Sequence, residues 1–333
     1  MAVDKVLLAA PRGFCAGVEM AIKALAWMVS SFEPPVYCYH EIVHNRLVVD
    51  RFRERGVVFV DSLDEVPDGA PLMLSAHGSP PDVVAAAAAK GGFVVDAVCP
   101  LVTKVHHEVK VRAGKGYTVL YVGHQGHDEA VGTMAVAPES IALVETEADV
   151  AALADPGRPV ALLAQTTLSH RDWAGVLDAA RDRFPDLWMP GRSDLCFATT
   201  NRQSALQSIA SRADAVVVIG SANSSNTVAL AKVAEAAAAE TADHAVRVLR
   251  VNGPDELPDD LQGTVAVTAG ASAPEDVVAS VIARLAPTGG VEQISFTDED
   301  EYFPPPRALR EHMTGEQLAA DRTVAASDVL AGL

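Results

Sequence analysis

The chain has no apolar run of the roughly 18 to 20 residues that a membrane-crossing helix requires. Its first stretch, MAVDKVLLAAPRGF, lacks the cationic start and the cleavage region of a signal peptide. Cysteine is also scarce, because the 333 residues contain only four, too few and too scattered for a secreted disulfide framework. We therefore expect a cytoplasmic protein with no membrane segment, whose cysteines are reduced.

Basic residues are in short supply as well. The chain has 26 Lys and Arg against 44 Asp and Glu, which gives a formal net charge of −18. Binding to a phosphate backbone needs basic patches, so this composition argues against a nucleic-acid partner. It does not exclude small anionic ligands, which local donors can hold. Neither a Walker-type GxxxxGK[ST] loop nor a Rossmann GxGxxG loop occurs.

What the sequence does contain is a threefold repeat. In each copy a cysteine precedes a helical pattern, a strand and a loop with polar residues. The strands are 36–39, 117–122 and 215–219. The cysteine and its loop residue are Cys15 and His44, Cys99 and His127, and Cys196 and Ser224, separated by 29, 28 and 28 positions. Self-similarity at a fixed period decides the architecture.

Strands alternate with helices along the whole chain, which predicts an α/β fold with parallel sheets. We expect three pseudo-symmetric α/β units around a common centre. The predicted bounds are 1–97, 98–194 and 195–287 for the units and 288–333 for a C-terminal arm and tail. The last twenty or so residues are expected to be weakly ordered.

The three repeated cysteines follow strands, where functional groups of open α/β sheets gather. If the units pack around one axis, Cys15, Cys99 and Cys196 converge, and their thiolates could hold an iron–sulfur cluster with one open iron or a zinc ion with one open position. A thiol before a helix lies near the positive end of its dipole, which favours the thiolate. Cys38 has no counterpart in the other units and is expected to be a small buried hydrophobe.

The strand-end loops would line the same cavity. They supply donors suited to a phosphate or diphosphate, namely His44, His77, Ser224, Ser225, Asn226 and Ser272, with Arg12, Arg46 and Arg202 near these motifs. The Ser and Asn residues could act both as a helix cap and as an anion site. His127 and Glu129 are the acid/base candidates, because a buried carboxyl group can hold its proton near neutral pH.

At this point the motifs resemble a known family. The segments PRGFCAGV, EIVHN, SAHG, AVCPLVTKVH, GHxGHxE, QTTLS, LCFATTNRQ, SxNSSNT and TAGASAP occur in the order of the LytB/IspH family, from about Val6 to Leu285. This family comprises the 4-hydroxy-3-methylbut-2-enyl diphosphate reductases of the non-mevalonate isoprenoid pathway. The resemblance implies three α/β units around an oxygen-sensitive [4Fe-4S] cluster with one open iron site.

Residue by residue, the resemblance implies a reductive dehydration that uses two electrons and gives isopentenyl and dimethylallyl diphosphate. Cys15, Cys99 and Cys196 would ligate the cluster. Glu129 would donate protons, with His127 in the same relay, and Thr166 would contact the substrate hydroxyl and Glu129. The diphosphate would be bound by His44, His77, Ser224, Ser225, Asn226 and Ser272. The implied electron donor is a small acidic ferredoxin or flavodoxin, for which a chain of charge −18 would need a local basic patch.

Two departures and two alternatives accompany this interpretation. Asp128 stands where the family often has Pro, and it would raise the pKa of Glu129 if both carboxyl groups point inward. The tail beyond about Arg310 contains no matching motif. A non-catalytic iron–sulfur sensor would explain the cysteines but not the polar loops. A zinc hydrolase with Glu129 as base would require three cysteine ligands, whereas hydrolytic zinc favours histidines and a carboxylate.

Overall fold

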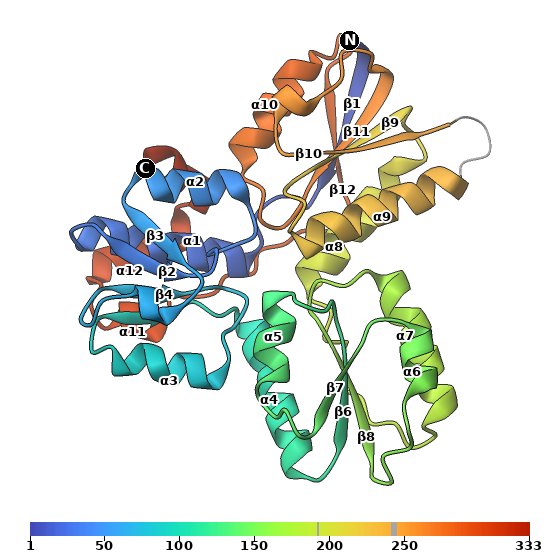
Figure 1. Ribbon diagram of the computed structural model, residues 1–333. Coiled ribbons are helices and arrows are strands. Elements are labelled where there is room, and N and C mark those ends of the chain that lie inside the picture. The colour runs from blue at the N-terminus through green and yellow to red at the C-terminus, as the bar shows by residue number, and fades with distance from the viewer. Residues whose placement is uncertain (192, 241–244) are drawn as a thin grey trace.

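The computed structural model describes residues 1–191, 193–240 and 245–333. The chain forms three α/β domains, each built on one parallel sheet and grouped around a common centre (Figure 1). The fold class predicted from the alternation of strands and helices is therefore confirmed. No helix among the described residues is long and apolar enough to cross a membrane.

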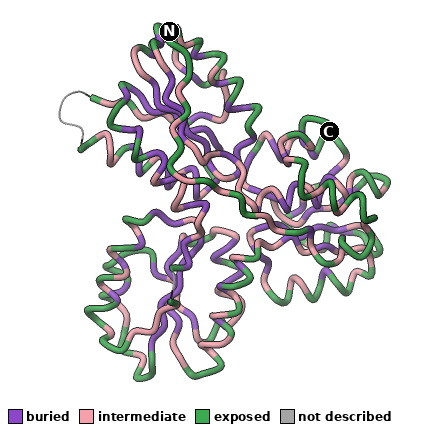
Figure 2. The backbone as a smooth tube through the Cα atoms, turned by 180° about the vertical axis from the view of Figure 1, so that it is seen from behind, coloured by how far each residue is buried: buried purple, intermediate pink, exposed green. Residues whose placement is uncertain are grey.

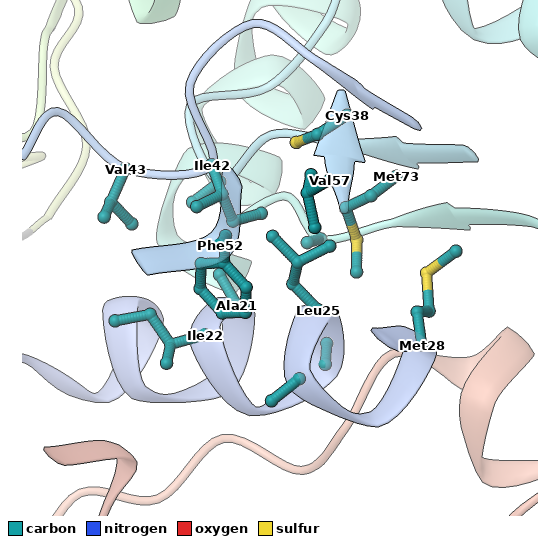
Figure 3. Close-up of a cluster of buried hydrophobic side chains, with 14 of the residues drawn as sticks. Ala21, Ile22, Leu25, Met28, Cys38, Ile42, Val43, Phe52, Val57 and Met73 are labelled. Atoms are coloured by element: carbon teal, nitrogen blue, oxygen red, sulfur yellow. The ribbon is translucent and has the colours of Figure 1, made fainter. Parts of the chain in front are cut away.

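The first domain has the sheet order β3-β2-β4-β5. Its elements are β2 (Val36–Tyr39), β3 (Val57–Val60), β4 (Leu72–Leu74), β5 (Val94–Asp96), α1 (Ala16–Ser31), α2 (Arg46–Glu54) and α3 (Pro81–Ala89). Figure 3 shows Leu25 and Met28 of α1 in one cluster with Cys38 and Met73 of the sheet. Cys38 has no solvent-exposed surface, so it is the small buried hydrophobe that the sequence predicted.

The second domain has the sheet order β7-β6-β8. Its elements are β6 (Thr118–Val122), β7 (Ile141–Val144), β8 (Val160–Ala164), α4 (Pro100–Gly114), α5 (Asp128–Met134), α6 (Glu147–Ala152) and α7 (His170–Arg183). Helices α4 and α5 pack on one face of the sheet, and α6 and α7 pack on the other (Figure 1). Because both faces are covered, β8 is an uninterrupted apolar run whose five residues are all buried.

The third domain has the sheet order β10-β9-β11-β1-β12. Its elements are β1 (Ala2–Ala10), β9 (Ala215–Ile219), β10 (Arg247–Val251), β11 (Gln262–Ala269), β12 (Val291–Ser295), α8 (Phe197–Ala210), α9 (Ser225–Glu240) and α10 (Glu275–Leu285). Helices α8 and α9 cover one face, and α10 covers the other.

The sheets divide the chain differently from the predicted bounds 1–97 and 288–333. Strand β1 lies in the third domain, where Leu7 pairs with Ala266 of β11 and with Glu292 of β12. The apolar run of β1 is buried on both faces, so it needs a central place in a sheet that is covered on both sides. In return, the C-terminal helices α11 (Arg307–Arg310), α12 (Gly315–Thr323) and α13 (Ala326–Gly332) belong to the first domain.

The expectation of a weakly ordered tail is wrong, because α12 and α13 are formed and docked. Leu330 is 2% exposed and packs in the core of the first domain. The backbone N–H of Ala326 donates to Glu19 of α1 at 3.0 Å, and Lys23 of the same helix donates to the carbonyl of Asp321 at 2.9 Å. The tail carries few apolar residues, so its sequence alone does not predict a packed helix. These residues are buried only because α1 lies beside them.

Each repeated cysteine lies where the chain passes from one domain to the next. Cys15 follows β1 of the third domain and precedes α1 of the first. Cys99 lies between β5 of the first domain and α4 of the second. Cys196 lies between the second domain, where Trp188 bridges to β8, and α8 of the third. The three crossings meet at the centre, which is why the repeat brings the thiols together.

Candidate active site

One central cavity collects the residues that the sequence singled out. Its lining includes Cys15, Cys99, Cys196, His44, His77, His127, Glu129, Thr166, Ser224, Ser225, Asn226 and Ser272. Phe303 of the C-terminal arm also lines this cavity. Phe303 could not be predicted from the sequence, because the arm carries no repeat motif and reaches the centre only on its way to the C-terminal helices of the first domain.

All three cysteines are the N-cap residues of helices. Cys15 precedes α1, Cys99 precedes α4 and Cys196 precedes α8. The Cys196 sulfur accepts the backbone N–H of Thr199 at 3.2 Å and lies 3.1 Å from its hydroxyl oxygen. Three helix dipoles therefore direct their positive ends at one group of thiols, which stabilises negative charge on the sulfurs.

The surroundings of the thiols fit a metal centre. Burial raises the pKa of Cys99 above its ordinary value and that of Cys196 to about 11, and the neighbouring Cys15 raises both. These two thiols stay protonated near neutral pH unless a metal replaces their protons. A Cβ atom on Gly17 would lie 2.7 Å from the Cys99 sulfur, so glycine is the residue that leaves room for it.

Arg202 is a buried cation that ties the cysteine segments together. Only 1% exposed, it donates to the carbonyl oxygens of Gly13 at 2.9 Å, Phe14 at 3.0 Å and Ala198 at 2.9 Å. It also forms a 2.9 Å ion pair with Glu299 of the C-terminal arm. One side chain thus connects the loop before α1, the first turn of α8 and the arm. Its contribution is structural, since it does not line the cavity.

The other arginines near the motifs are also absent from the cavity lining. Arg12 pairs with Glu275, and the side chain of Arg46 is 82% exposed. Among the described residues, the lining contains no Lys or Arg at all. An anionic ligand in this cavity would therefore be held by imidazole, hydroxyl, amide and backbone groups.

Glu129 is buried, and both of its carboxylate oxygens accept hydrogen bonds from Thr166. It is 2% exposed, and it accepts the backbone N–H of Thr166 at 2.7 Å and the Thr166 hydroxyl at 2.9 Å. Burial raises the pKa of Glu129 to about 7, although the bonds from Thr166 act in the opposite direction. This carboxyl group therefore exchanges its proton near neutral pH, as an acid catalyst must.

His127 caps helix α5 with its own ring. Its Nδ1 accepts the backbone N–H of Glu129 at 3.2 Å, and burial lowers the pKa of His127 to about 4. The ring is therefore neutral at pH 7 and carries its proton on Nε2. This arrangement fixes both the ring and the first turn of α5, and so fixes the direction of Glu129.

Two further histidines are stacked beside it. The rings of His44 and His77 lie 3.9 Å apart and nearly parallel, and the His127 ring meets His44 edge-on at 5.2 Å. Burial lowers the pKa of His77 well below its ordinary value, and the positive charges of neighbouring histidines add to this. The cluster can thus present neutral imidazole N–H groups to a ligand.

Asp128 points toward the histidines, so the condition under which it would raise the pKa of Glu129 is not met. Its carboxylate accepts a 2.9 Å hydrogen bond from His40 and lies 3.7 Å from His44 and 3.8 Å from His77. Burial alone would raise the pKa of Asp128, but the hydrogen bond from His40 brings it below its ordinary value. Asp128 therefore stays ionised as the shared partner of these rings.

The Ser and Asn residues surround the start of α9. Ser272 donates to the carbonyl of His44 at 3.0 Å, which connects the third domain to the first. Asn226 accepts the N–H of Ala271 at 3.0 Å. Helix α9 begins at Ser225, so its free N–H groups and positive dipole end face the cavity that these residues line. Such an arrangement is an anion site.

Comparison with known proteins agrees with this geometry. A family model described as LytB protein matches residues 6–286. The chain belongs to the LytB family. The resemblance drawn from the sequence motifs is therefore confirmed.

Individual LytB-family relatives cover most of the chain. It is 49% identical over 322 residues to the 4-hydroxy-3-methylbut-2-enyl diphosphate reductase of Rhodopirellula baltica. The aligned residues cover 95% of this chain and 98% of that protein. It is also 49% identical over 288 residues to reductase 1 of Mycobacterium tuberculosis, spanning 84% and 85%. The solved structure of the Plasmodium falciparum E-1-hydroxy-2-methyl-but-2-enyl-4-diphosphate reductase superposes with a TM-score of 0.87 at 31% identity, covering 93% of this chain and 98% of that one.

Proposed function

We propose that this protein is a 4-hydroxy-3-methylbut-2-enyl diphosphate reductase whose reaction takes place in the central cavity. The reductases to which it is 45 to 49% identical support this activity. The observation that carries the proposal is the convergence of three thiols, a carboxyl group of pKa about 7 and an anion site in one cavity. The reaction consumes two electrons and two protons, replaces the allylic C–O bond with a C–H bond and releases water. The products are isopentenyl and dimethylallyl diphosphate, made in the cytoplasm.

Cys15, Cys99 and Cys196 would hold an iron–sulfur cluster, of [4Fe-4S] type with one iron left open. The donor set supports this, because three thiols at helix N-termini line one cavity and Gly17 leaves room for the Cys99 sulfur. Three cysteines leave one iron of such a cluster without a protein ligand. When bound, the cluster supplies electrons and a Lewis acid toward the C–O bond.

Glu129 is the proton donor in this proposal. One proton leaves with the hydroxyl group as water, and a second is added to the allyl fragment. The Thr166 hydroxyl, which donates to Glu129 in the free protein, can turn to the substrate hydroxyl and connect the two groups. His127 holds the α5 turn with Nδ1 and retains a proton on Nε2 with which to bind substrate.

The diphosphate group would lie against His44, His77 and the start of α9. Ser224, Ser225, Asn226 and Ser272 provide hydroxyl and amide donors there. Because Lys and Arg are absent from the described lining, recognition depends on fixed hydrogen bonds and the α9 dipole. A ferredoxin or flavodoxin would deliver the electrons.

The experiment that tests the proposal is anaerobic purification followed by oxidation of a reduced viologen dye with 4-hydroxy-3-methylbut-2-enyl diphosphate. We expect a brown protein that oxidises the dye only when the substrate is present. A brown protein that ignores the substrate would favour an iron–sulfur sensor. A colourless protein containing zinc would remove the cluster from the proposal.

The rate should depend on pH through Glu129. Its pKa is raised to about 7, so the protonated donor predominates below this pH and is lost above it. We expect the dye-driven kcat to fall up to about tenfold per pH unit on the alkaline side. The Thr166→Val variant loses the hydroxyl that lowers this pKa. The alkaline limb of its pH–rate profile, where kcat falls with rising pH, should therefore move to higher pH. A wild-type rate that stays flat up to pH 9 would contradict the assignment of Glu129.

Asp128→Asn should leave this alkaline limb in place. The carboxylate of Asp128 faces His40, His44 and His77, and the pKa of Glu129 is raised chiefly by its own burial. We expect the midpoint of the alkaline fall in kcat to move by no more than about 0.3 pH units. The loss of a charge in direct contact with Glu129 would move it by about one unit. Measuring kcat from pH 6 to 9 for both proteins checks this. A downward shift near one unit would mean that the two carboxyl groups interact directly.

A further inference from the structure

A basic surface lies on helix α4, which begins directly after Cys99. The exposed basic side chains, which we call the α4 basic stripe, are Lys104, His107, Lys110 and Lys115. The single carboxylate of the helix, Glu108, lies 3.4 Å from Arg112, which neutralises its charge. This stripe is positive although the chain carries a formal net charge of −18.

The electrostatics of the helix itself do not account for the whole stripe. Cations are favoured near a helix C-terminus, where they interact with the negative end of the dipole, and this explains Lys115. Lys104 lies near the opposite end, where a cation is disfavoured. Its ammonium nitrogen is 3.5 Å from the buried Asp194, while 46% of its side chain remains exposed. Asp194 therefore compensates much of the charge of Lys104, and the uncompensated positive charge of the stripe lies at Lys110 and Lys115, in the second half and at the end of α4.

The near end of the stripe lies close to the thiols. In the first turn of α4, Leu101 lines the cavity while Pro100 and Thr103 are exposed, so one helical turn separates cavity and solvent. A helix rises 1.5 Å per residue, which places Lys104 roughly 8 Å and Lys110 roughly 16 Å along the axis from Cys99. Figure 1 shows α4 on one side of the second domain's sheet, beside α5.

The other arginine-rich helix is less positive on balance. Helix α2 carries Arg46 and Arg53, and both of them pair with Asp50 on the same helix. Its Arg51 pairs with Asp276 of α10. By contrast, no carboxylate of residues 1–191, 193–240 or 245–333 forms an ion pair with Lys110 or Lys115. The uncompensated charge thus favours α4.

We propose that the α4 basic stripe is the docking surface for an acidic one-electron carrier protein of the ferredoxin or flavodoxin type. This inference rests on the proposed reductase function, which needs two electrons from outside the chain. Each docking event oxidises one carrier by one electron, and two events supply one turnover. Complementary charge raises the association rate and fixes the orientation of the carrier, and salt screens it.

The test is the double charge reversal Lys110→Glu with Lys115→Glu. Both side chains are exposed and lie outside the cavity lining, so the reaction driven by a small dye should be unchanged. With a reduced acidic ferredoxin as the donor, we expect the KM for ferredoxin to rise about tenfold or more. The rate of the wild type should fall as salt is added, and the rate of the variant should respond much less.

The matched control is Arg171→Glu with Arg181→Glu on α7, the helix that covers the opposite face of the same sheet. These side chains are also exposed, and Arg181 lies in the last turn of its helix as Lys115 lies at the end of α4. The change in net charge is the same in both variants. We expect the control to keep the wild-type KM for ferredoxin.

Each outcome distinguishes the proposals. A variant of the stripe that keeps the wild-type KM for ferredoxin would overturn the docking surface, and so would an equal rise in the α7 control. A wild type that does not oxidise the dye with substrate would instead remove the reductase function, whatever ferredoxin does. Selective loss of the ferredoxin reaction, with dye oxidation retained, establishes the stripe.

Discussion

Glu129→Gln should lower the dye-driven kcat by about 10²- to 10⁴-fold, the usual contribution of a positioned general acid. The amide has the size of the carboxyl group, so its oxygen can still accept one bond from Thr166, and the fold around the cavity is retained. What the variant lacks is an acidic proton. The physical reason for a large effect is that the neighbouring His127 cannot take over as the acid, since burial makes it neutral with a pKa of about 4.

The informative control is the cluster itself. Iron and sulfide content and the visible spectrum of Glu129→Gln should match those of the wild type, because Glu129 is not a thiol ligand and lies in the second domain's α5 turn. Single-turnover experiments would then show substrate bound but not converted. A variant that retains more than about a tenth of the wild-type kcat would assign the proton to another group, such as water.

Cys99→Ser or Cys196→Ser should remove the bound iron and abolish turnover. A serine hydroxyl is a much poorer ligand for iron than a thiolate, and each of these sulfurs lies at a helix N-terminus that stabilises negative charge. Iron and sulfide analysis after anaerobic reconstitution measures the loss independently of activity.

The chain provides its own control in Cys38. This cysteine is completely buried in the core of the first domain, away from the cavity lining. Cys38→Ala should keep full iron content and turnover, at a cost of about 1 kcal/mol in the free energy of unfolding. Equal loss of iron in all three variants would mean that the effect comes from unfolding and not from ligation.

Much of the site followed from the repeat, because side chains that come after parallel strands meet at one edge of each sheet. The positions of Cys15, Glu129 and Ser272 could be predicted in this way. The direction of Asp128 could not, since adjacent residues in a first helical turn point to different sides. Nor could Arg202, whose partners Gly13 and Glu299 are remote in sequence.

The fold was predicted least well at its ends. The repeat correctly marks the cysteines at which the chain passes between domains. The first repeat unit, however, begins with β1, whereas the first domain contains α1 but not this strand. Pairing between β1 and β11 joins residues that are more than 250 positions apart. Local patterns carry no information on such a partner. The docking of α13 on α1 was missed for the same reason.

This exchange of ends has a consequence for synthesis on the ribosome. The second domain is encoded in one continuous stretch and can fold as soon as it emerges. The third domain needs β1, which must wait for its neighbours β11 and β12, made more than 250 residues later. The first domain likewise waits for α13. The nascent chain therefore carries the apolar strand β1 unpaired until β11 and β12 have been made, and the completed third domain can only then help to bring the three thiols together.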